Sequence, residues 1–488
     1  MSSISKKGND QTRLKKNIAL STAYQVLAVL IPFITAPYVS RILGVNNIGI
    51  YSYTNSHVQF FMLFGALGTL SYGSREISRN REDKFKRSQL FWEIAILTVI
   101  TSLIVIGVWL AWICFHPDSR LLYLIWTISL LGTLFDISWL YSGLEQFRHT
   151  VTQNVIFKLL GMLATFIFVN SADDLWIYVL IIAATQMLAN LSMWVYLPKY
   201  VIAIPIKQLH ILPHFKETLV YFIPTIAVSI YTILDKVLIG AITHDNCENG
   251  NYEQATKIIT IAKSMAFVGV NLVLQSRISY LFVLENYEEI KKQIHKSIDY
   301  MVFISVGIMF GIIGIANRFV PLYYGAGYEK TSTLLMVMAP IVLIVSISNC
   351  LGSQYYNPAG LRSKSAKYII IGSMVNLVLN LLFIPRYKSV GAVIASIIAE
   401  VLITSLYMIN VNGYYSFKEL SKVLWKKLIA GVIMMCAVFY LGELIQSGIV
   451  SVVVQVTVGV AVYSLILILL KDSFVTDFVL RKSKLLDK

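Results

Sequence analysis

The sequence predicts an all-α polytopic membrane protein with about fourteen transmembrane helices, and three observations lead to this fold class. Apolar residues make up 57% of the 488 residues and charged residues 14%, against roughly 45–50% and about 25% in soluble proteins. About fourteen stretches hold the roughly 20 mostly apolar residues that a helix needs to cross a bilayer. The segments between them are too short for a soluble domain, and the longest one on the outer side is about 243–253.

The predicted spans follow one another along almost the whole chain. They are 18–42, 48–71, 89–114, 121–142, 151–170, 174–197, 217–242, 254–283, 298–317, 331–356, 367–384, 389–411, 424–446 and 449–470. The stretch 254–283 is the least typical, because it contains three basic residues.

The basic residues give these spans an orientation. Of the 41 Lys and Arg residues, 31 lie in segments on the same side as the N-terminus, 6 lie on the opposite side and 4 lie within spans. Cytoplasmic loops are the ones that carry an excess of Lys and Arg. We therefore expect both termini in the cytoplasm, and we attribute most of the net charge of +15 to topology rather than to a nucleic-acid partner.

Tryptophan placement agrees with the predicted spans. All eight tryptophans lie near span ends, where their amphipathic rings are expected to form an interfacial belt. They are Trp92, Trp109, Trp112, Trp126, Trp139, Trp176, Trp194 and Trp425.

The chain repeats itself weakly at an interval of about 195 residues. Ile31-Pro32, Ile42-Leu43-Gly44 and Gly49-Ile50-Tyr51 correspond to Ile223-Pro224, Leu238-Ile239-Gly240 and Gly250-Asn251-Tyr252. An even number of spans separates the copies, so both enter the membrane in the same direction, as in transporters built from parallel repeats. We expect a cytoplasmic segment 1–16, a six-helix lobe 17–200, a second lobe 201–411, two further helices in 412–470 and a cytoplasmic tail 471–488.

Several ionisable residues lie inside the spans, where charge costs several kcal/mol unless it faces protein or water. Lys236, Lys257, Lys263 and Arg277 are the basic ones, and Asp235 precedes Lys236 directly. A basic and partly desolvated cavity would bind an anion such as a phosphate or pyrophosphate. The alternative is that Asp235 neutralises Lys236 or Lys257 and that the other side chains snorkel to the interface.

Three more charged residues belong to this set. Arg41 closes the first span, Asp136 lies in the fourth and Glu400 lies in the twelfth. Asp235 and Glu400 are candidates for coupling transport to an ion, and each has the alternative of a counter-charge or packing role.

Signals for catalysis and for metal binding are lacking in the sequence. The four cysteines are scattered, and no P-loop, HExxH motif or nucleophile elbow occurs. His210 and His214 are four residues apart, but Pro213 lies between them, so we place both in a solvated cytoplasmic loop. We expect a protein that is not an enzyme and that uses no cofactor and no metal.

The order of several motifs along the spans resembles that of the oligosaccharide flippases of bacterial polysaccharide synthesis, the Wzx or polysaccharide transporter family. This family belongs to the superfamily of multidrug and lipid-linked-oligosaccharide exporters. The stretches concerned are 36–44 with 49–52, 72–77 with 91–93, 139–147, 222–227 with 230–231, 234–236 and 239–240, 252–255 with 257–258, and Asn376 and Asn380 with 384–385 and 391–392.

The resemblance implies a flippase in the cell membrane of a bacterium, with two six-helix lobes in a V around a central basic cavity. Its substrate would be an undecaprenyl-pyrophosphate-linked repeat unit for capsule, exopolysaccharide or a teichoic-acid-like polymer. Partners would be the bilayer, an exchanged H⁺ or Na⁺, and polymer-assembly machinery. Arg41, Asp235, Lys236, Lys257 and Arg277 lie in matching stretches, whereas Lys263 is added for its depth in the span.

Three alternatives stay open at this point. A multidrug exporter of the same superfamily would favour cationic substrates and acidic cavities, and a peptidoglycan-precursor flippase would share the fold. A membrane polymerase or ligase acting on the same glycans would usually display a large outer loop with catalytic residues, which the short outer segments do not provide.

Overall fold

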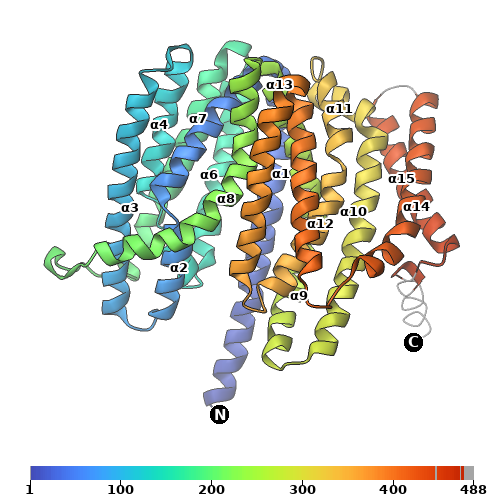
Figure 1. Ribbon diagram of the computed structural model, residues 1–488. Helices are drawn as coiled ribbons and strands as arrows, with labels where there is room; N and C mark the ends of the chain where they lie inside the picture. The colour runs from blue at the N-terminus through green and yellow to red at the C-terminus, as the bar shows by residue number, and fades with distance from the viewer. Residues whose placement is uncertain (1, 446–447, 473, 477–488) are drawn as a thin grey trace. The chain divides into compact units, whose positions relative to one another are not determined.

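The computed structural model describes residues 2–445, 448–472 and 474–476, and within these residues the chain is helical with no strand (Figure 1). Each of the fourteen predicted spans lies largely in helix. Nine helical segments of the described residues are long and apolar enough to cross a membrane. The all-α polytopic fold class is therefore confirmed. Of the predicted tail 471–488, residues 473 and 477–488 lie outside the described part.

The chain divides into two compact units, Met1–Val237 and Leu238–Lys488, with the division inside the long helix α8. The helices of the first unit are α1 (Ser2–Ala66), α2 (Thr69–Arg79), α3 (Lys84–Ile113), η1 (Pro117–Ser119), α4 (Arg120–Leu134), α5 (Ser138–Gly143), α6 (Phe147–Phe168), η2 (Ala172–Asp174), α7 (Leu175–Met193), η3 (Trp194–Lys199), η4 (Ile206–Gln208) and the beginning of α8 (Leu212–Thr243). We expected the two lobes to meet near residue 200, and their relation as repeats stays a prediction.

The second unit begins with the end of α8. Its further helices are α9 (Asn246–Val283), α10 (Tyr287–Tyr324), α11 (Glu329–Met338), α12 (Pro340–Leu351), the π-helix η5 (Gly352–Tyr356), α13 (Arg362–Ile409), α14 (Phe417–Leu444) and α15 (Ile449–Leu469).

Two of the long helices contain a sharp kink that separates two predicted spans. In α1 the kink is at Gly44, with φ 73° and ψ 167°, a conformation that a residue without Cβ adopts most easily. In α13 it is at Lys388, with φ 51° and ψ −132°. Each helix therefore supplies two of the predicted spans.

The core of the first unit uses tryptophan in a way that the sequence did not predict. Trp109, Trp126 and Trp139 are fully buried, and the ring of Trp139 stacks on Phe91 with 5.5 Å between centroids. The expectation that all eight tryptophans form an interfacial belt is therefore wrong for these three, which pack between helices. Trp176 and Trp425 are exposed, as a belt residue would be.

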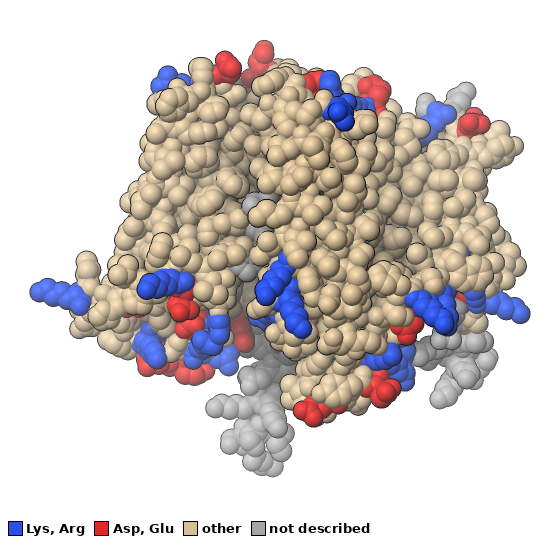
Figure 2. All heavy atoms as spheres, in the orientation of Figure 1, with Lys and Arg blue, Asp and Glu red and all other residues tan. Residues whose placement is uncertain are grey.

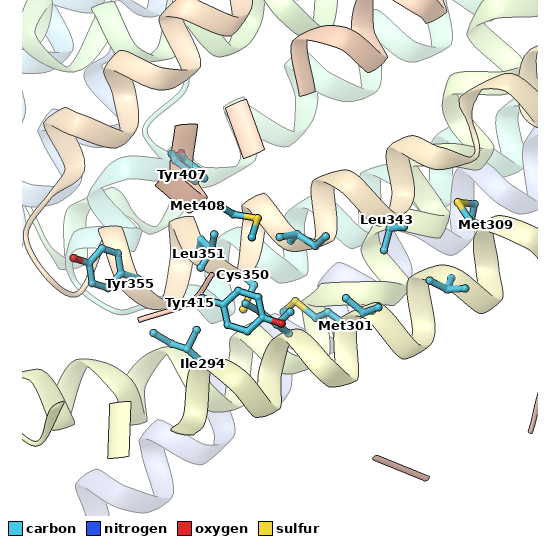
Figure 3. Close-up of a cluster of buried hydrophobic side chains, with 14 of the residues drawn as sticks. Ile294, Met301, Met309, Leu343, Cys350, Leu351, Tyr355, Tyr407, Met408 and Tyr415 are labelled. Atoms are coloured by element: carbon cyan, nitrogen blue, oxygen red, sulfur yellow. The ribbon is translucent and has the colours of Figure 1, made fainter. Parts of the chain in front are cut away.

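The core of the second unit lies along one face of α10. Ile290, Ile294, Ile298, Met301 and Val302 are fully buried, at the spacing of three and four residues that places side chains on one face of a helix. This face packs with residues of α12, α13 and α14 (Figure 3). In lipid such helices associate through close packing rather than through the hydrophobic effect.

Charged side chains on the face shown in Figure 2 lie mostly toward the ends of helices, and uncharged residues form a broad band between them. This is the distribution that a bilayer imposes, because its hydrocarbon core offers no water to a charged group. The charged side chains that are buried among the helices are exceptions to this pattern.

Candidate functional site

Three of the predicted site residues belong to the first unit. Arg41 lies on α1, three residues before the kink at Gly44, and is exposed. Asp235 and Lys236 lie next to each other on α8, where Asp235 is buried and Lys236 is half-buried. A buried carboxylate in a membrane-spanning helix needs a compensating partner, so Asp235 keeps its place among the candidate residues.

Lys257 of the second unit has a carboxylate partner on its own helix. Its Nζ lies 3.4 Å from Oε1 of Glu253, one turn earlier on α9, and Glu253 is buried. Residues four apart on a helix are neighbours, so the sequence alone indicates this pair, in place of the contact with Asp235 that we considered as the alternative. The pair lowers the net positive charge that Lys257 offers to an anion.

The charge of Glu400 acts on Lys263 although 136 residues separate them in the sequence. Lys263 is half-buried on α9, Glu400 is buried in the second half of α13, and the two groups attract each other electrostatically. We had assigned Lys263 to the substrate and Glu400 to an ion. An anion approaching Lys263 therefore also meets the negative charge of Glu400.

Arg277 lies apart from this pair. It is fourteen residues beyond Lys263 on α9, which corresponds to about 21 Å along the helix axis, and its side chain is exposed. Its charge acts on Glu289, in the first turn of α10. Lys263 and Arg277 therefore cannot bind the same phosphate group within this unit.

A cluster of uncharged polar side chains lies between these two positions on α9 and was missed in the sequence. Nδ2 of Asn271 donates to Oδ1 of Asn349 over 2.6 Å, and Oγ of Ser353 donates to Oδ1 of Asn271 over 2.9 Å. All three residues are half-buried. Amide and hydroxyl groups of this kind can exchange hydrogen bonds with the hydroxyls of a sugar.

The solvated loop that we predicted around His210 and His214 is only partly correct. His210 is exposed, but His214 is buried, because α8 begins at Leu212 and carries His214 into the first unit. Pro213 does not prevent this helix, since proline is accepted in the first turn, where its missing N–H would have no helical partner.

Taken together, the helices and the interior charged pairs define a multi-pass, all-helical membrane protein. The model of the family described as "Polysaccharide biosynthesis protein" matches residues 14–282, which is more than half of the chain. The chain therefore belongs to this family, and the resemblance inferred from its motifs is confirmed.

Individual relatives agree with this placement. The chain is 23% identical over 405 residues to a protein of Escherichia coli (strain K12) named "Putative O-antigen transporter". The aligned region covers 82% of this chain and 97% of that protein. Among solved structures, the lipid II flippase MurJ in an inward closed conformation superposes with a TM-score of 0.73 at 16% identity, covering 94% and 99% of the two chains. An inward-facing multidrug transporter of the MATE family gives 0.59 at 13% identity, covering 84% and 94%. At these identities the structural similarity supports the fold alone.

Proposed function

We propose that this protein is a flippase that moves an oligosaccharide linked to undecaprenyl pyrophosphate from the cytoplasmic to the outer leaflet of a bacterial inner membrane. It would act by alternating access, with both termini in the cytoplasm, and supply capsule, exopolysaccharide or a similar surface polymer. The observation that carries the proposal is the half-buried ammonium group of Lys263 on α9, on which the charge of the buried Glu400 acts, in a chain of the polysaccharide biosynthesis family.

The physical need for such a protein lies in the substrate. The many hydroxyl groups of a glycan would lose their hydrogen bonds in hydrocarbon, at a cost of several kcal/mol for each unpaired group. A protein path lined with polar side chains replaces those bonds, while the lipid tail stays in the bilayer. The half-buried amides Asn271 and Asn349 are groups of this kind.

Lys263 would hold the pyrophosphate. An ammonium group forms charge-assisted hydrogen bonds to phosphate oxygens, which are roughly twice as strong as neutral ones. Glu400 would make the binding reversible, because its carboxylate takes Lys263 back when the substrate leaves. A cation that neutralises Glu400 would favour substrate binding, which gives a route by which an H⁺ or Na⁺ gradient could drive the cycle. Arg41, Lys236, Lys257 and Arg277 would contact the substrate elsewhere on its path, with Asp235 as a second ion-coupling group.

The test is a flipping assay with the full chain in proteoliposomes. The substrate is an undecaprenyl-pyrophosphate-linked oligosaccharide from a strain that makes the polymer, and a lectin outside the vesicles reports its arrival in the outer leaflet. Lys263→Met should slow flipping by roughly tenfold or more, since a hydrogen bond to a charged group contributes about 1.5–3 kcal/mol. Lys422→Met is the matched control, because Lys422 is an exposed residue on α14, and it should flip at the wild-type rate.

Two outcomes contradict the proposal. One is flipping by Lys263→Met at the wild-type rate with equal protein incorporation. The other is the absence of lipid-linked oligosaccharide flipping by the wild type together with export of a cationic dye, which would indicate a multidrug exporter.

A further inference from the structure

Three buried polar side chains of the first unit form a hydrogen-bonded chain. Nε2 of His214, on α8, lies 2.8 Å from Oε2 of Glu93, on α3. Nδ1 of the same imidazole lies 2.6 Å from the hydroxyl of Tyr72, on α2. Tyr72, Glu93 and His214 are all at most 9% exposed. The cluster thus connects three helices at one point, shielded from solvent.

The Glu93 carboxylate accepts further hydrogen bonds. Its Oε1 receives the backbone N–H of His210 over 2.8 Å and Nε2 of Gln89 over 3.0 Å. Together with Nε2 of His214, these groups place three donors around the Glu93 carboxylate. Without a charged partner, an ionised Glu93 would leave one net negative charge buried, which is costly.

Other charged groups also surround the cluster. Burial first, and then the carboxylates of Glu76 on α2, Glu217 on α8 and Glu93, raise the pKa of Tyr72 to about 12, against the opposing effect of Arg75. The Tyr72 hydroxyl therefore keeps its proton at any physiological pH. The imidazole of His214 lies at the centre of the cluster, with one ring nitrogen facing the Glu93 carboxylate and the other facing the Tyr72 hydroxyl.

We propose that Glu93 and His214 form a proton-binding site. With a neutral imidazole, Nε2–H donates to Glu93 and Nδ1 accepts the Tyr72 O–H. When a proton binds at Nδ1, both ring nitrogens become donors, Nδ1–H points at the Tyr72 oxygen, and the imidazolium charge cancels that of the carboxylate. The ligand of the site is H⁺, and its uptake removes the buried net charge instead of creating one.

Proton binding would fasten the beginning of α8 to the first unit. The hydrogen bond between His214 and Glu93 is charge-assisted on both sides when the imidazole is protonated and weaker when it is neutral. The segment before α8 is tied to the same helix α3, because Nε1 of Trp92 donates to the carbonyl of Ile202 over 3.0 Å. Since α8 continues across the division between the two units at Val237, the site controls the attachment of the helix that joins them.

The experiment is hydrogen exchange on the full chain in nanodiscs, followed in peptides from residues 201–216 and corrected for the intrinsic pH dependence of exchange. In the wild type, protection should fall by about tenfold between about pH 6 and pH 8, the change expected when a charge-assisted bond becomes neutral. His214→Gln keeps an amide donor toward Glu93 but cannot bind a proton, so its protection should not change with pH. Glu93→Gln should behave in the same way.

The control is His149→Gln. His149 lies in the same unit and is half-buried, with its Nε2 3.1 Å from the hydroxyl of Tyr200. This variant should keep the wild-type pH dependence. Tyr72→Phe, which removes only the hydroxyl, should lower protection at every pH and keep its dependence on pH. If His214→Gln does not fold, this variant and the wild type together test the proposal.

The proposal is overturned if protection in the wild type does not change with pH. It is also overturned if protection in His214→Gln still changes with pH, or if protection in His149→Gln does not. Because the measurement needs no substrate, its result is independent of the flipping assay.

Discussion

One buried carboxylate in each unit is paired with a different kind of basic side chain. In the first unit Glu93 meets a histidine, His214. In the second unit Glu248 at the beginning of α9 meets Lys330 of α11, with 2.6 Å between Oε2 and Nζ, and accepts the hydroxyl of Ser389 over 2.6 Å. A lysine keeps its charge throughout the physiological range, whereas a histidine changes it. The choice of cation therefore decides whether a buried contact is permanent or adjustable.

A further buried site of the second unit follows the same rule. The side chain of Lys427, on α14, is completely buried, and its Nζ lies 2.6 Å from Asp299 of α10 and 3.0 Å from Asp472 after α15. One ammonium group thus ties α14 and the segment after α15 to α10. Both of these buried contacts of the second unit use lysine.

The largest effect is expected for Lys427→Met. It leaves the buried carboxylate of Asp472 and the half-buried carboxylate of Asp299 without their ammonium partner, and breaking a buried ion pair in this way costs about 3–5 kcal/mol. Reversible unfolding of the full chain in detergent micelles measures the loss. Lys422→Met on the exposed surface of the same helix should change the free energy of unfolding by less than about 0.5 kcal/mol. If the two variants are equally stable, the ion pairs of Lys427 do not stabilise the second unit.

Gly68→Ala tests the other contact between α2 and α8 in the first unit. Gly68 has φ 73°, and an added Cβ would lie 2.9 Å from the backbone nitrogen of Phe222. Backbone strain and overpacking together should cost about 2–3 kcal/mol. Gly360→Ala in the second unit is the control for strain alone, since it also has φ 73° but meets nothing within 4 Å. If both lose the same stability, α8 does not pack tightly on α2.

Lys330→Met should cost about 2 kcal/mol in the second unit. The loss is smaller than for Lys427 because Glu248 retains the hydroxyl of Ser389, and because Lys330 itself is partly exposed. Lys388→Met serves as the comparison, because this lysine lies 3.7 Å from Glu248 and is half-exposed, and exposed pairs contribute up to about 1 kcal/mol. Thermal unfolding of the wild type, Lys330→Met and Lys388→Met in one detergent ranks their stabilities. A larger loss for Lys388→Met than for Lys330→Met would argue against Lys330 as the main partner of Glu248.

The smallest effect concerns acid. Burial of the Glu248 carboxyl raises its pKa, but hydrogen bonds from Lys330 and Ser389 and the Lys330 charge outweigh burial, so the pKa lies below its usual value of 4.5. A depressed pKa adds stability at pH values above the unfolded-state pKa and loses it as the pH falls through the folded one. The Glu248 contact should therefore be insensitive between about pH 6 and 8 and should weaken only in stronger acid.

Hydrogen exchange at the beginning of α9 measures this acid response, and Glu248→Gln should abolish it. A loss of protection at neutral pH in this region would contradict the assignment of Glu248 to a permanent contact.

The sequence predicted the positions of the helices well, because hydropathy and length report directly on a bilayer. It also placed several charges inside the spans, and that placement stays a prediction. It did not predict their partners across the fold, since no local rule connects Lys263 with Glu400. The burial of His214 was missed for a different reason: Pro213 was taken as a break in the helix, whereas it occupies a first turn that tolerates proline.

The kink at Lys388 in α13 has a consequence for mutational scanning. Its backbone angles, φ 51° and ψ −132°, resemble those of the first central residue of a type II′ turn, where glycine is preferred. Lys388→Gly would release about 1–3 kcal/mol of strain and at the same time delete the ammonium group 3.4 Å from Asp245. The two changes oppose each other, so a survey that ranks positions by thermal tolerance would underestimate what the Lys388 charge contributes.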